Sequence, residues 1–448
     1  MRDWTPQRVA QAAGGRLVAS GPPTEGPQRV VIDSREVAPG DLFFGLAGAR
    51  DDGGRFAARA LEDGAWGVVV GPHFASRIPG GVVIEAQDPL AALQSLARAW
   101  RRELAAQVVG ITGSTGKTTT KDILAALLVS HRRTVASPLN LNTEIGLPLA
   151  ILAAPPGTEV LVLELAMRGA GQIAELAAVC EPNVGVIVNI GPAHLEQLGS
   201  LAGVAAAKAE LLGALPPDGT AIIPADEPLL EPHLHDAPNV VRFGPGGQVS
   251  VVGAGEQGVV LDVFGEQLLV EPGFRAPHLL SDLCAAVAAA HALGVRVEGE
   301  VDVELAPLRG ERVELIGGVT LINDCYNANP LSMRAAIAEL AADGTAVRRL
   351  AVIGDMLELG AEAEQYHLEL GELATDAHVL VLITVGSLAG LAAETYVGGE
   401  HFHAADADEA AGLLAPLLAR GDVVLVKGSR GVGLERVALR LALMRAGT

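Results

Sequence analysis

Short, nearly all-apolar runs rich in β-branched residues constrain the fold of this chain more than any other feature. Most are followed by glycine, and Ala- and Leu-rich stretches with helical spacing lie between them. The runs are VVGIT from residue 108, VLVLEL from 160, VGVIVNIG from 184, LAVIG from 350, VLVLITVG from 379 and DVVLVKG from 422. Strands this apolar are buried on both faces, and their alternation with helices predicts an α/β fold with parallel sheets.

The chain has 448 residues, which at roughly 150 residues per domain leaves room for about three domains. Residues 1–88 hold short strands separated by turn signals, and they predict a small N-terminal α/β domain. Asp88 followed by Pro89 is typical of a helix start. We therefore expect a helix over 89–105 that bridges into the second domain.

The central domain is expected over 89–305 and the C-terminal one, a Rossmann-like domain, over 306–448. An acidic stretch near residues 300–310 separates the two series of strands and helices. Residues 239–272 lack helical spacing and contain GPGG and GAGEQG, so they predict a small antiparallel insertion in the central domain.

Charge and composition exclude several classes of protein. The chain carries 32 basic against 53 acidic residues, a formal net charge of −21, which argues against nucleic-acid binding. Three isolated cysteines form neither a disulfide framework nor a CxxC zinc site. The N-terminus has no apolar signal region, and the longest uncharged apolar run, 379–393, is too short for a bilayer. We expect a cytoplasmic protein without membrane insertion.

The sharpest chemical signal is GITGSTGKTTT at 110–120, directly after a predicted strand. A strand, a glycine-rich turn and a helix together aim backbone N–H groups at a phosphate chain, with Lys117 in reach of its terminal phosphates. The Thr118 hydroxyl is placed for Mg²⁺. A strict Walker pattern needs glycine at Ile111, whereas the first glycine here is Gly110. The pattern predicts ATP binding; the alternative is a glycine turn that only caps a helix.

Two polar residues near strand ends support a metal site. Glu164 ends the run VLVLEL, where an unpaired carboxylate would be costly to bury, and His194 lies just past another strand. Such strand ends share the edge where ligands bind in parallel sheets. The alternatives are a solvated carboxylate and a structural histidine. Lys208 lies in a short helical stretch, and by itself it reads as a surface lysine.

The third domain offers two polar loops. Asp324 ends a strand and precedes YNANP, a cluster that could orient sugars or phosphates or could be ordinary turn chemistry. KGSRG at 427–431 follows another apolar strand and makes Lys427 and Arg430 available to an anion. A loop that is simply exposed to solvent, with no anion bound, explains KGSRG equally well.

Together these motifs resemble those of the ATP-dependent Mur ligases of peptidoglycan synthesis. The resemblance is strongest to the branch that adds D-alanyl-D-alanine to UDP-N-acetylmuramoyl-tripeptide, and it runs almost end to end. The motifs are DSREVAPGDLFFGLAG (33–48), GSTGKTTTK, NLNTEIGLPL (140–149), NIGPAHLEQLGS (189–200), AAKAELL (206–212), NDCYNANPLSM (323–333), GDMLELG (354–360) and VLVKGSRG (424–431). YNANP separates this branch from its relatives best.

The resemblance implies roles for individual residues. Ser34 and Arg35 would contact the UDP-sugar, and Asn142 and Thr143 would reach toward the muramoyl part. The nucleotide would be held by Gly113, Ser114, Thr115, Gly116, Lys117, Thr118, Thr119, Asp282, Arg312 and Asp324. Two Mg²⁺ ions would be held by Thr118, Glu164, His194 and Lys208, and the catalytic set would be Lys117, Glu164, His194 and Lys208. Substrate contacts in the third domain would come from Tyr326, Asn327, Asn329, Lys427, Ser429 and Arg430.

Lys208 matches a lysine that family members carry as a carbamate, an anionic oxygen ligand. The amine must first lose its proton, which with a pKa of ~10.4 costs roughly 4–5 kcal/mol at pH ~7. Metal coordination or strong burial would have to offset that cost. The chain also departs from the family pattern, since Leu279 and Asp282 stand where asparagines are usual. Gly54 stands where the family's Asp-Gly-His has histidine.

The resemblance implies an acyl-phosphate route, in which ATP activates the tripeptide carboxylate and the amine of D-alanyl-D-alanine then attacks it. The enzyme would close its domains over the reactants and is expected to act as a monomer. Alternatives are a ligase that adds one diamino acid to the dipeptide precursor, a P-loop phosphotransferase, and a nucleotide-gated scaffold without turnover.

Overall fold

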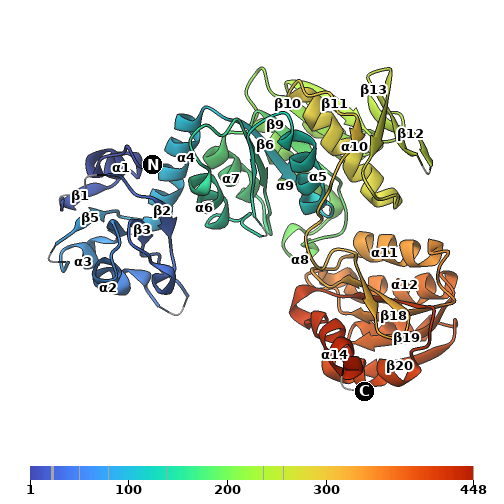
Figure 1. Cartoon of the computed structure of the whole chain (residues 1–448). Coiled ribbons are helices and arrows are strands. Elements are labelled where there is room, and N and C mark those ends of the chain that lie inside the picture. The colour runs from blue at the N-terminus through green and yellow to red at the C-terminus, as the bar shows by residue number, and fades with distance from the viewer. Residues whose placement is uncertain are drawn as a thin grey trace.

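Within the described part of the chain, three β-sheets form, each with its own helices. The computed structural model describes residues 1–21, 25–49, 51–78, 80–138, 140–235, 237–255 and 257–446. Figure 1 shows the three units in chain order, from the blue N-terminal unit through the green and yellow central unit to the orange and red C-terminal one. The predicted boundaries after residues 88 and 305 fall between the strands of neighbouring sheets, and they stay predictions.

The N-terminal sheet has the strand order β1–β5–β4–β3–β2, in which β1 is antiparallel to β5 and the other neighbours are parallel. Its strands are β1 (Arg16–Ala19), β2 (Arg29–Val31), β3 (Asp41–Phe44), β4 (Gly67–Val70) and β5 (Val82–Glu85). Its helices are α1 (Pro6–Ala12), α2 (Ala57–Glu62) and α3 (Pro72–Ala75), with 3₁₀ turns η1 (Ser34–Glu36) and η2 (Gly53–Phe56). All four side chains of β3, including that of Asp41, are buried.

The central sheet has the order β15–β14–β13–β12–β11–β10–β9–β6–β8–β7. Its strands are β6 (Gln107–Thr112), β7 (Thr134–Ala136), β8 (Val160–Glu164), β9 (Val184–Ile187), β10 (Thr220–Pro224), β11 (Asn239–Phe243), β12 (Val249–Gly255), β13 (Gly258–Val263), β14 (Glu266–Glu271) and β15 (Gly299–Glu300). Its helices are α4 (Pro89–Leu104), α5 (Lys117–Val129), α6 (Gly146–Ala153), α7 (Gln172–Cys180), α8 (Leu195–Leu198), α9 (Leu201–Gly213), η3 (Pro228–His233) and α10 (Pro277–Ala292).

Helices cover both faces of this sheet, as the all-apolar strands predict. In β8, Leu161 and Leu163 pack with α4, α6, α7 and α9, whereas Val160 and Val162 pack with α5 and α10 on the opposite face. Successive side chains of a strand point to opposite faces, so an unbroken apolar run feeds two cores at once. The predicted parallel sheet with helices on both sides is confirmed.

The antiparallel insertion expected over 239–272 is present, but it is part of the main sheet. β12, β13 and β14 pair in antiparallel fashion. β11, however, is parallel to β10, with Val240 beside Ala221 and Val241 beside Ile222. The strands therefore continue the sheet from its β10 edge, where their backbone groups satisfy the edge hydrogen bonds that a separate small sheet would leave open.

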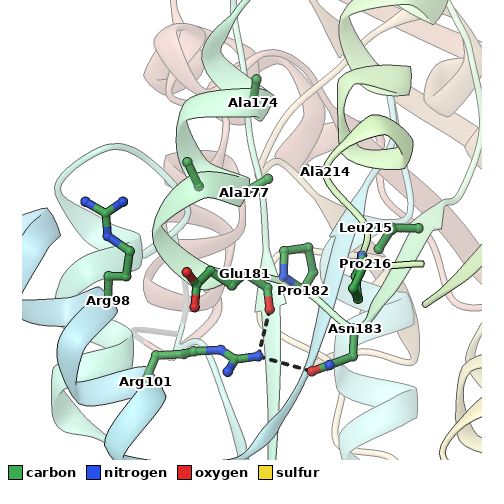
Figure 2. Close-up of a pocket in the computed structure, with 11 residues that line it drawn as sticks. Arg98, Arg101, Ala174, Ala177, Glu181, Pro182, Asn183, Ala214, Leu215 and Pro216 are labelled. Atoms are coloured by element: carbon green, nitrogen blue, oxygen red, sulfur yellow. Dashed lines mark hydrogen bonds between the residues drawn. The ribbon is translucent and has the colours of Figure 1, made fainter. Parts of the chain in front are cut away.

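Helix α4 lies between the first two units. The Asp88 side chain caps it by accepting hydrogen bonds from the N–H groups of Leu90 and Ala91, at 2.8 and 3.2 Å. Farther along, Arg101 donates to the Glu181 carbonyl at 2.8 Å and to Oδ1 of Asn183 at 3.2 Å, at the rim of a hollow of about 570 Å³ (Figure 2). These bonds fasten the helix expected over 89–105 to the end of α7.

The C-terminal sheet has the order β16–β17–β21–β18–β19–β20, with β16 antiparallel to β17 and the other neighbours parallel. Its strands are β16 (Glu311–Leu315), β17 (Val319–Asp324), β18 (Arg348–Gly354), β19 (Val379–Val385), β20 (Glu400–Ala404) and β21 (Asp422–Lys427). Its helices are α11 (Pro330–Ala342), α12 (Ala363–Asp376), α13 (Ala407–Leu414) and α14 (Glu435–Ala446), with η4 (Gly360–Glu362), η5 (Ala389–Glu394), η6 (Ala415–Leu417) and η7 (Arg430–Val432). Among the described residues, no helix is long and apolar enough to cross a membrane.

Candidate active site

The predicted phosphate-binding loop, 110–120, joins the end of β6 to the start of α5. Gly116 has a φ of +74°, in the left-handed region that favours glycine. A Cβ atom there would lie 2.4 Å from Oδ1 of Asp282, so a side chain would also clash. Lys117 folds back over the loop, and its Nζ donates to the Gly113 carbonyl at 2.9 Å. Burial lowers the pKa of the Lys117 amine.

Asn189, which follows β9, ties the loop to the neighbouring strand end. Its Oδ1 accepts hydrogen bonds from the N–H groups of Ser114 and Thr115, at 3.1 and 3.0 Å. Its Nδ2 donates to the Thr115 hydroxyl at 2.9 Å. The Ser114 hydroxyl bonds to the backbone of Gly191 on the same segment. Thr119, the last predicted loop residue, is buried in the first turn of α5.

Glu164 lies at the end of β8 with only 2% of its surface exposed. The Thr118 hydroxyl donates to its Oε2 at 2.7 Å, and Asn142 donates its side-chain N–H to Oε1 at 2.9 Å. Both donors are neutral, and among the described residues Glu164 has no ion pair. The strand end therefore holds a buried carboxyl group, and the hydroxyl of Thr118 lies directly beside it.

His194 caps α8 from the left-handed region, with a φ of +57°. Its Nδ1 lies 2.6 Å from Oε2 of Glu358, which belongs to the C-terminal unit. Arg168 approaches the other oxygen of that carboxylate at 3.8 Å. Burial lowers the pKa of His194 below its usual value, against the opposing effect of Glu358.

Lys208 lies on α9 and is also only 2% exposed. Burial lowers the pKa of its amine well below the usual value, and the charge of Lys117 acts in the same direction. Among the described residues it has neither a hydrogen bond nor an ion pair. It is therefore not the surface lysine that its local sequence would suggest. No group of three or more His, Cys, Asp or Glu side chains in the described residues is arranged to hold a metal by itself.

A cavity of about 600 Å³ lies between the central and C-terminal units. A hydrogen bond from Asn329 Nδ2 to the Ser114 carbonyl, at 3.3 Å, bridges the two units beside it. The predicted site residues that line this cavity are Ser114, Lys117, Thr118, His194, Tyr326, Asn327, Asn329, Ser429 and Arg430. The structure thus brings the phosphate-binding loop and the YNANP loop, more than 200 residues apart in sequence, to one cavity.

Tyr326 presents its ring to two arginines of this cavity. The guanidinium of Arg309 lies 4.1 Å from the ring centroid, and that of Arg430 lies 5.9 Å from it. Arginine stacked on an aromatic face is held in place while its N–H groups stay free for an anion. The cavity therefore combines Lys117 with two arginines, a local positive field in a chain of net charge −21.

The strand ends of β17 and β21 are linked by an ion pair. Lys427 is 2% exposed, and its Nζ lies 2.6 Å from Asp324 Oδ2 and 3.0 Å from the Asn327 carbonyl. The Ser429 hydroxyl donates to the Ala328 carbonyl at 3.3 Å. These contacts shape the YNANP loop, and Lys427 itself does not line the cavity.

Several predicted residues lie away from this cavity. Arg35 is exposed and pairs with Asp33 at 2.5 Å in the N-terminal unit, next to Ser34. Arg312 is 43% exposed and pairs with Asp343 at 2.5 Å. Two others are Thr143, whose hydroxyl accepts from the Gly146 N–H at 3.4 Å, and Asp282, packed against the phosphate-binding loop. Burial raises the pKa of the Asp282 carboxyl well above its usual range.

Four residues that build the site were missed by the sequence reasoning. They are Asn189, Arg168, Arg309 and Glu358. Asn189 and Glu358 stand inside motifs already noted, NIGPAHLEQLGS and GDMLELG, so a signal was present. Arg309 lies in the irregular segment between the two units, three residues before Arg312, and only the fold shows which of the two enters the cavity.

Comparison with known proteins places this arrangement in a family. Residues 111–290 match the Mur ligase middle domain, and residues 308–430 match the Mur ligase glutamate ligase domain. The UDP-N-acetylmuramoyl-tripeptide–D-alanyl-D-alanine ligase of Bacillus subtilis is 34% identical, covering 91% of this chain and 92% of its own length. The chain belongs to the Mur ligase family.

Further relatives of this Mur ligase carry the same name or fold. The protein of that name from Mycobacterium tuberculosis is 36% identical and covers 98% of this chain and 97% of its own length. A crystal structure of MurF from Acinetobacter baumannii superposes with a TM-score of 0.89 at 30% identity, covering 98% and 99% of the two chains. MurF from Thermotoga maritima, solved in complex with ADP, has a TM-score of 0.84 at 30% identity, covering 94% and 98%.

Proposed function

We propose that this Mur ligase joins D-alanyl-D-alanine to the tripeptide carboxylate of UDP-N-acetylmuramoyl-tripeptide, using ATP, in the synthesis of peptidoglycan precursors. One observation carries the proposal: the phosphate-binding loop and the YNANP loop line one cavity. The names of the B. subtilis and M. tuberculosis relatives support the choice of substrates. The ADP complex of the T. maritima protein supports ATP as the nucleotide.

The reaction needs activation because a carboxylate is a poor electrophile toward an amine. One carboxylate oxygen attacks the γ-phosphorus of ATP, the bond to ADP breaks, and an acyl phosphate forms. The amine of D-alanyl-D-alanine then attacks the acyl carbon. The tetrahedral intermediate expels phosphate, and the nitrogen loses a proton to complete the amide. Positioning and charge neutralisation are the main contributions the protein can make.

The chain's own residues supply those contributions. Lys117 and Thr118 act at the phosphates, and Arg309 and Arg430 add positive charge from the C-terminal side of the cavity. Arg309 lines the cavity, and the nucleotide contact that we predicted for Arg312 stays a prediction. Closure of the two units over this cavity would also keep water from the acyl phosphate. Ser34 and Arg35 hold the UDP-sugar, and Asn142 and Thr143 reach toward the muramoyl part.

The donors near the phosphate-binding loop fit Mg²⁺. Thr118 and Glu164 offer the hydroxyl and carboxylate oxygens that this ion prefers, and His194 and Lys208 complete the proposed set. Bound Mg²⁺ would neutralise charge on the ATP phosphates. We also propose that Lys208 is carbamylated: its nitrogen bonds to the carbon of CO₂ and releases a proton, which leaves an anionic carbamate. The lowered pKa of the buried amine supports this step, since the neutral amine is the reactive form. Added mass at Lys208 in the intact protein tests it.

The remaining assignments follow from the substrates. We propose a cytoplasmic, monomeric enzyme that acts on a UDP-linked precursor and ATP, with no nucleic-acid partner. Asp282, Asp324, Tyr326, Asn327, Asn329, Lys427 and Ser429 are proposed to shape the nucleotide and substrate contacts around the cavity.

The test is phosphate release with Mg-ATP and UDP-N-acetylmuramoyl-tripeptide, with and without D-alanyl-D-alanine, followed by mass spectrometry of the products. We expect release that depends on the dipeptide and a UDP-muramoyl-pentapeptide product. A product formed only from a single diamino acid and the dipeptide precursor would assign the other ligase branch. A stable phosphorylated product would make the chain a phosphotransferase. If neither amine stimulated phosphate release, the alternative of a nucleotide-gated scaffold without turnover would remain.

A further inference from the structure

Two non-glycine residues with left-handed backbones meet where the central and C-terminal units touch. His194, directly before α8, has a φ of +57°, and Glu358, two residues before η4, has a φ of +64°. Such a backbone is uncommon outside glycine and persists where surrounding contacts hold it. Here the two side chains hold each other, with 2.6 Å between Nδ1 of His194 and Oε2 of Glu358.

Other contacts keep this pair in register. The Glu196 N–H donates to the Glu358 carbonyl at 3.4 Å, which places the first turn of α8 against the segment before η4. A Cβ atom on Gly360 would lie 3.3 Å from the Cα of Glu196, so the two backbones approach closely. Arg168, from the loop after β8, lies 3.8 Å from the second oxygen of Glu358. The Glu358 carboxylate is thus set between a cation and the imidazole.

The contact fixes which nitrogen of His194 carries the proton. A carboxylate only accepts hydrogen bonds, so Nδ1 must donate to Glu358. With that proton on Nδ1, a neutral imidazole has its lone pair on Nε2. His194 lines the cavity that also holds Lys117 and Thr118. A carboxylate behind a histidine is the usual arrangement for a metal-ligating imidazole.

We propose that Glu358 is a positioning residue of the ligase reaction: docking of the C-terminal domain brings its carboxylate to His194 and fixes the Nδ1–H form, which leaves Nε2 available as a ligand for the Mg²⁺ that the phosphate site would hold. The inference rests on the proposed function. It means that the central domain alone lacks a correctly oriented His194. Phosphoryl transfer is thereby coupled to the docked arrangement of the two domains, in which the acyl phosphate is also shielded from water.

The kinetic test compares three variants at Glu358 with a control. Glu358→Ala removes the acceptor, and Glu358→Gly also relieves the left-handed backbone, so it separates loss of the carboxylate from strain. Glu358→Gln keeps an oxygen that can accept from Nδ1–H. The control is Glu362→Ala, four residues on, whose carboxylate instead bonds the Tyr366 hydroxyl at 3.0 Å. For Ala and Gly we expect kcat to fall, and the half-saturating Mg²⁺ concentration to rise, by about 10–100-fold. The KM for D-alanyl-D-alanine should change little.

Glu358→Gln should recover most of the loss, and Glu362→Ala should match wild type. Two further measurements do not depend on catalysis. The first is amide hydrogen exchange of residues 194–200 in the ligand-free protein. The second is ADP binding, measured by calorimetry at increasing Mg²⁺ concentration. We expect several-fold faster exchange in Glu358→Ala than in Glu362→Ala, and weaker ADP binding that excess Mg²⁺ restores.

Each outcome decides one claim. Wild-type Mg²⁺ dependence in Glu358→Ala overturns the positioning role, even if exchange becomes faster, because the contact would then be only structural. Failure of Glu358→Gln to recover function also overturns it. If the wild-type protein makes no pentapeptide, the proposed function fails by itself, while exchange and ADP binding still test the link between Glu358 and His194.

Discussion

At the scale of single residues, Gly116 combines two constraints that can be separated by mutation. Its backbone is left-handed, and a Cβ would clash with Asp282. Gly171 has a φ of +84° but, among the described atoms, nothing within 4 Å of its Cβ position, so it is a matched control for backbone strain alone. We expect Gly116→Ala to lower the melting temperature at least about 3 °C more than Gly171→Ala. If calorimetry gave the same drop in melting temperature for both variants, Asp282 would be able to move away from the new Cβ without loss of stability, which contradicts the prediction.

Lys208 gives a prediction for pH dependence. Burial lowers its pKa in the folded protein below the value of the unfolded chain. Between those two pKa values the unfolded state binds more protons, so the unfolding free energy of the wild type rises with pH. Lys208→Met keeps a long unbranched side chain without a charge. We therefore expect the variant to be more stable than wild type at pH 7, with a gap that shrinks toward pH ~10.

The measurement is urea unfolding at a series of pH values in CO₂-free buffer, which keeps a carbamate from forming. Lys121→Met is the control, because Lys121 is equally buried but paired with Asp122 at 2.5 Å. That variant should lose stability, since it leaves the partly buried Asp122 carboxylate without its ion-pair partner. A stability gap for Lys208→Met that is the same at every pH contradicts the prediction.

At the scale of elements, local signals were sufficient for much of the fold. The apolar strands and the start of α4 at Pro89 follow from short stretches of sequence, since burial on both faces and helix capping are local effects. Pairing is not local. Sequence reasoning separated 239–272 from the main sheet, whereas β11 continues it, because only the folded β10 edge determines where that strand pairs.

The site divides in the same way. Lys117, Thr118 and Glu164 could be predicted because a strand, a loop and a helix in fixed order bring them together. The contributions of Arg309 and Glu358 could not, because they depend on how the C-terminal unit lies against the central one. Lys208 was identified only through resemblance, since its burial comes from packing that its own helix does not determine.

Asn329 links an element boundary to the phosphate-binding loop. Its Oδ1 accepts from the Ser332 N–H at 2.9 Å and caps α11, while its Nδ2 donates to the Ser114 carbonyl at 3.3 Å. Asn329→Asp keeps the cap but places a carboxylate against that carbonyl. We expect it to retain stability and to lose about tenfold or more in kcat, whereas Asn329→Ala also loses about 1 kcal/mol of stability. Melting curves and phosphate-release rates separate the two effects, and wild-type activity in Asn329→Asp would contradict the link.

At the scale of the whole molecule, the buried clusters divide the chain into two cooperative parts. One apolar cluster spans the N-terminal and central units, and it contains Trp4 and Ile84 as well as Leu161 and Leu163. The rings of Trp4 and Trp100 of α4 meet edge to face, 5.7 Å apart. In the described residues, the fully buried members of the C-terminal clusters all lie between 315 and 441. The C-terminal unit therefore has its own core, and from its α12 Tyr366 also packs against the joint cluster.

This division predicts two thermal transitions in calorimetry, one shared by the N-terminal and central units and one for the C-terminal unit. Trp100→Ala should lower the shared transition by about 4–8 °C and leave the other in place, because it removes a large side chain from the joint core. Leu414→Ala, in the C-terminal core, should do the reverse. Saturating ADP with Mg²⁺ should draw the two transitions together if the nucleotide binds between the units, since only the docked arrangement would offer both sets of contacts. A single transition in the ligand-free protein, or a Trp100→Ala shift in both, would mean that the polar contacts at the cavity already couple the units.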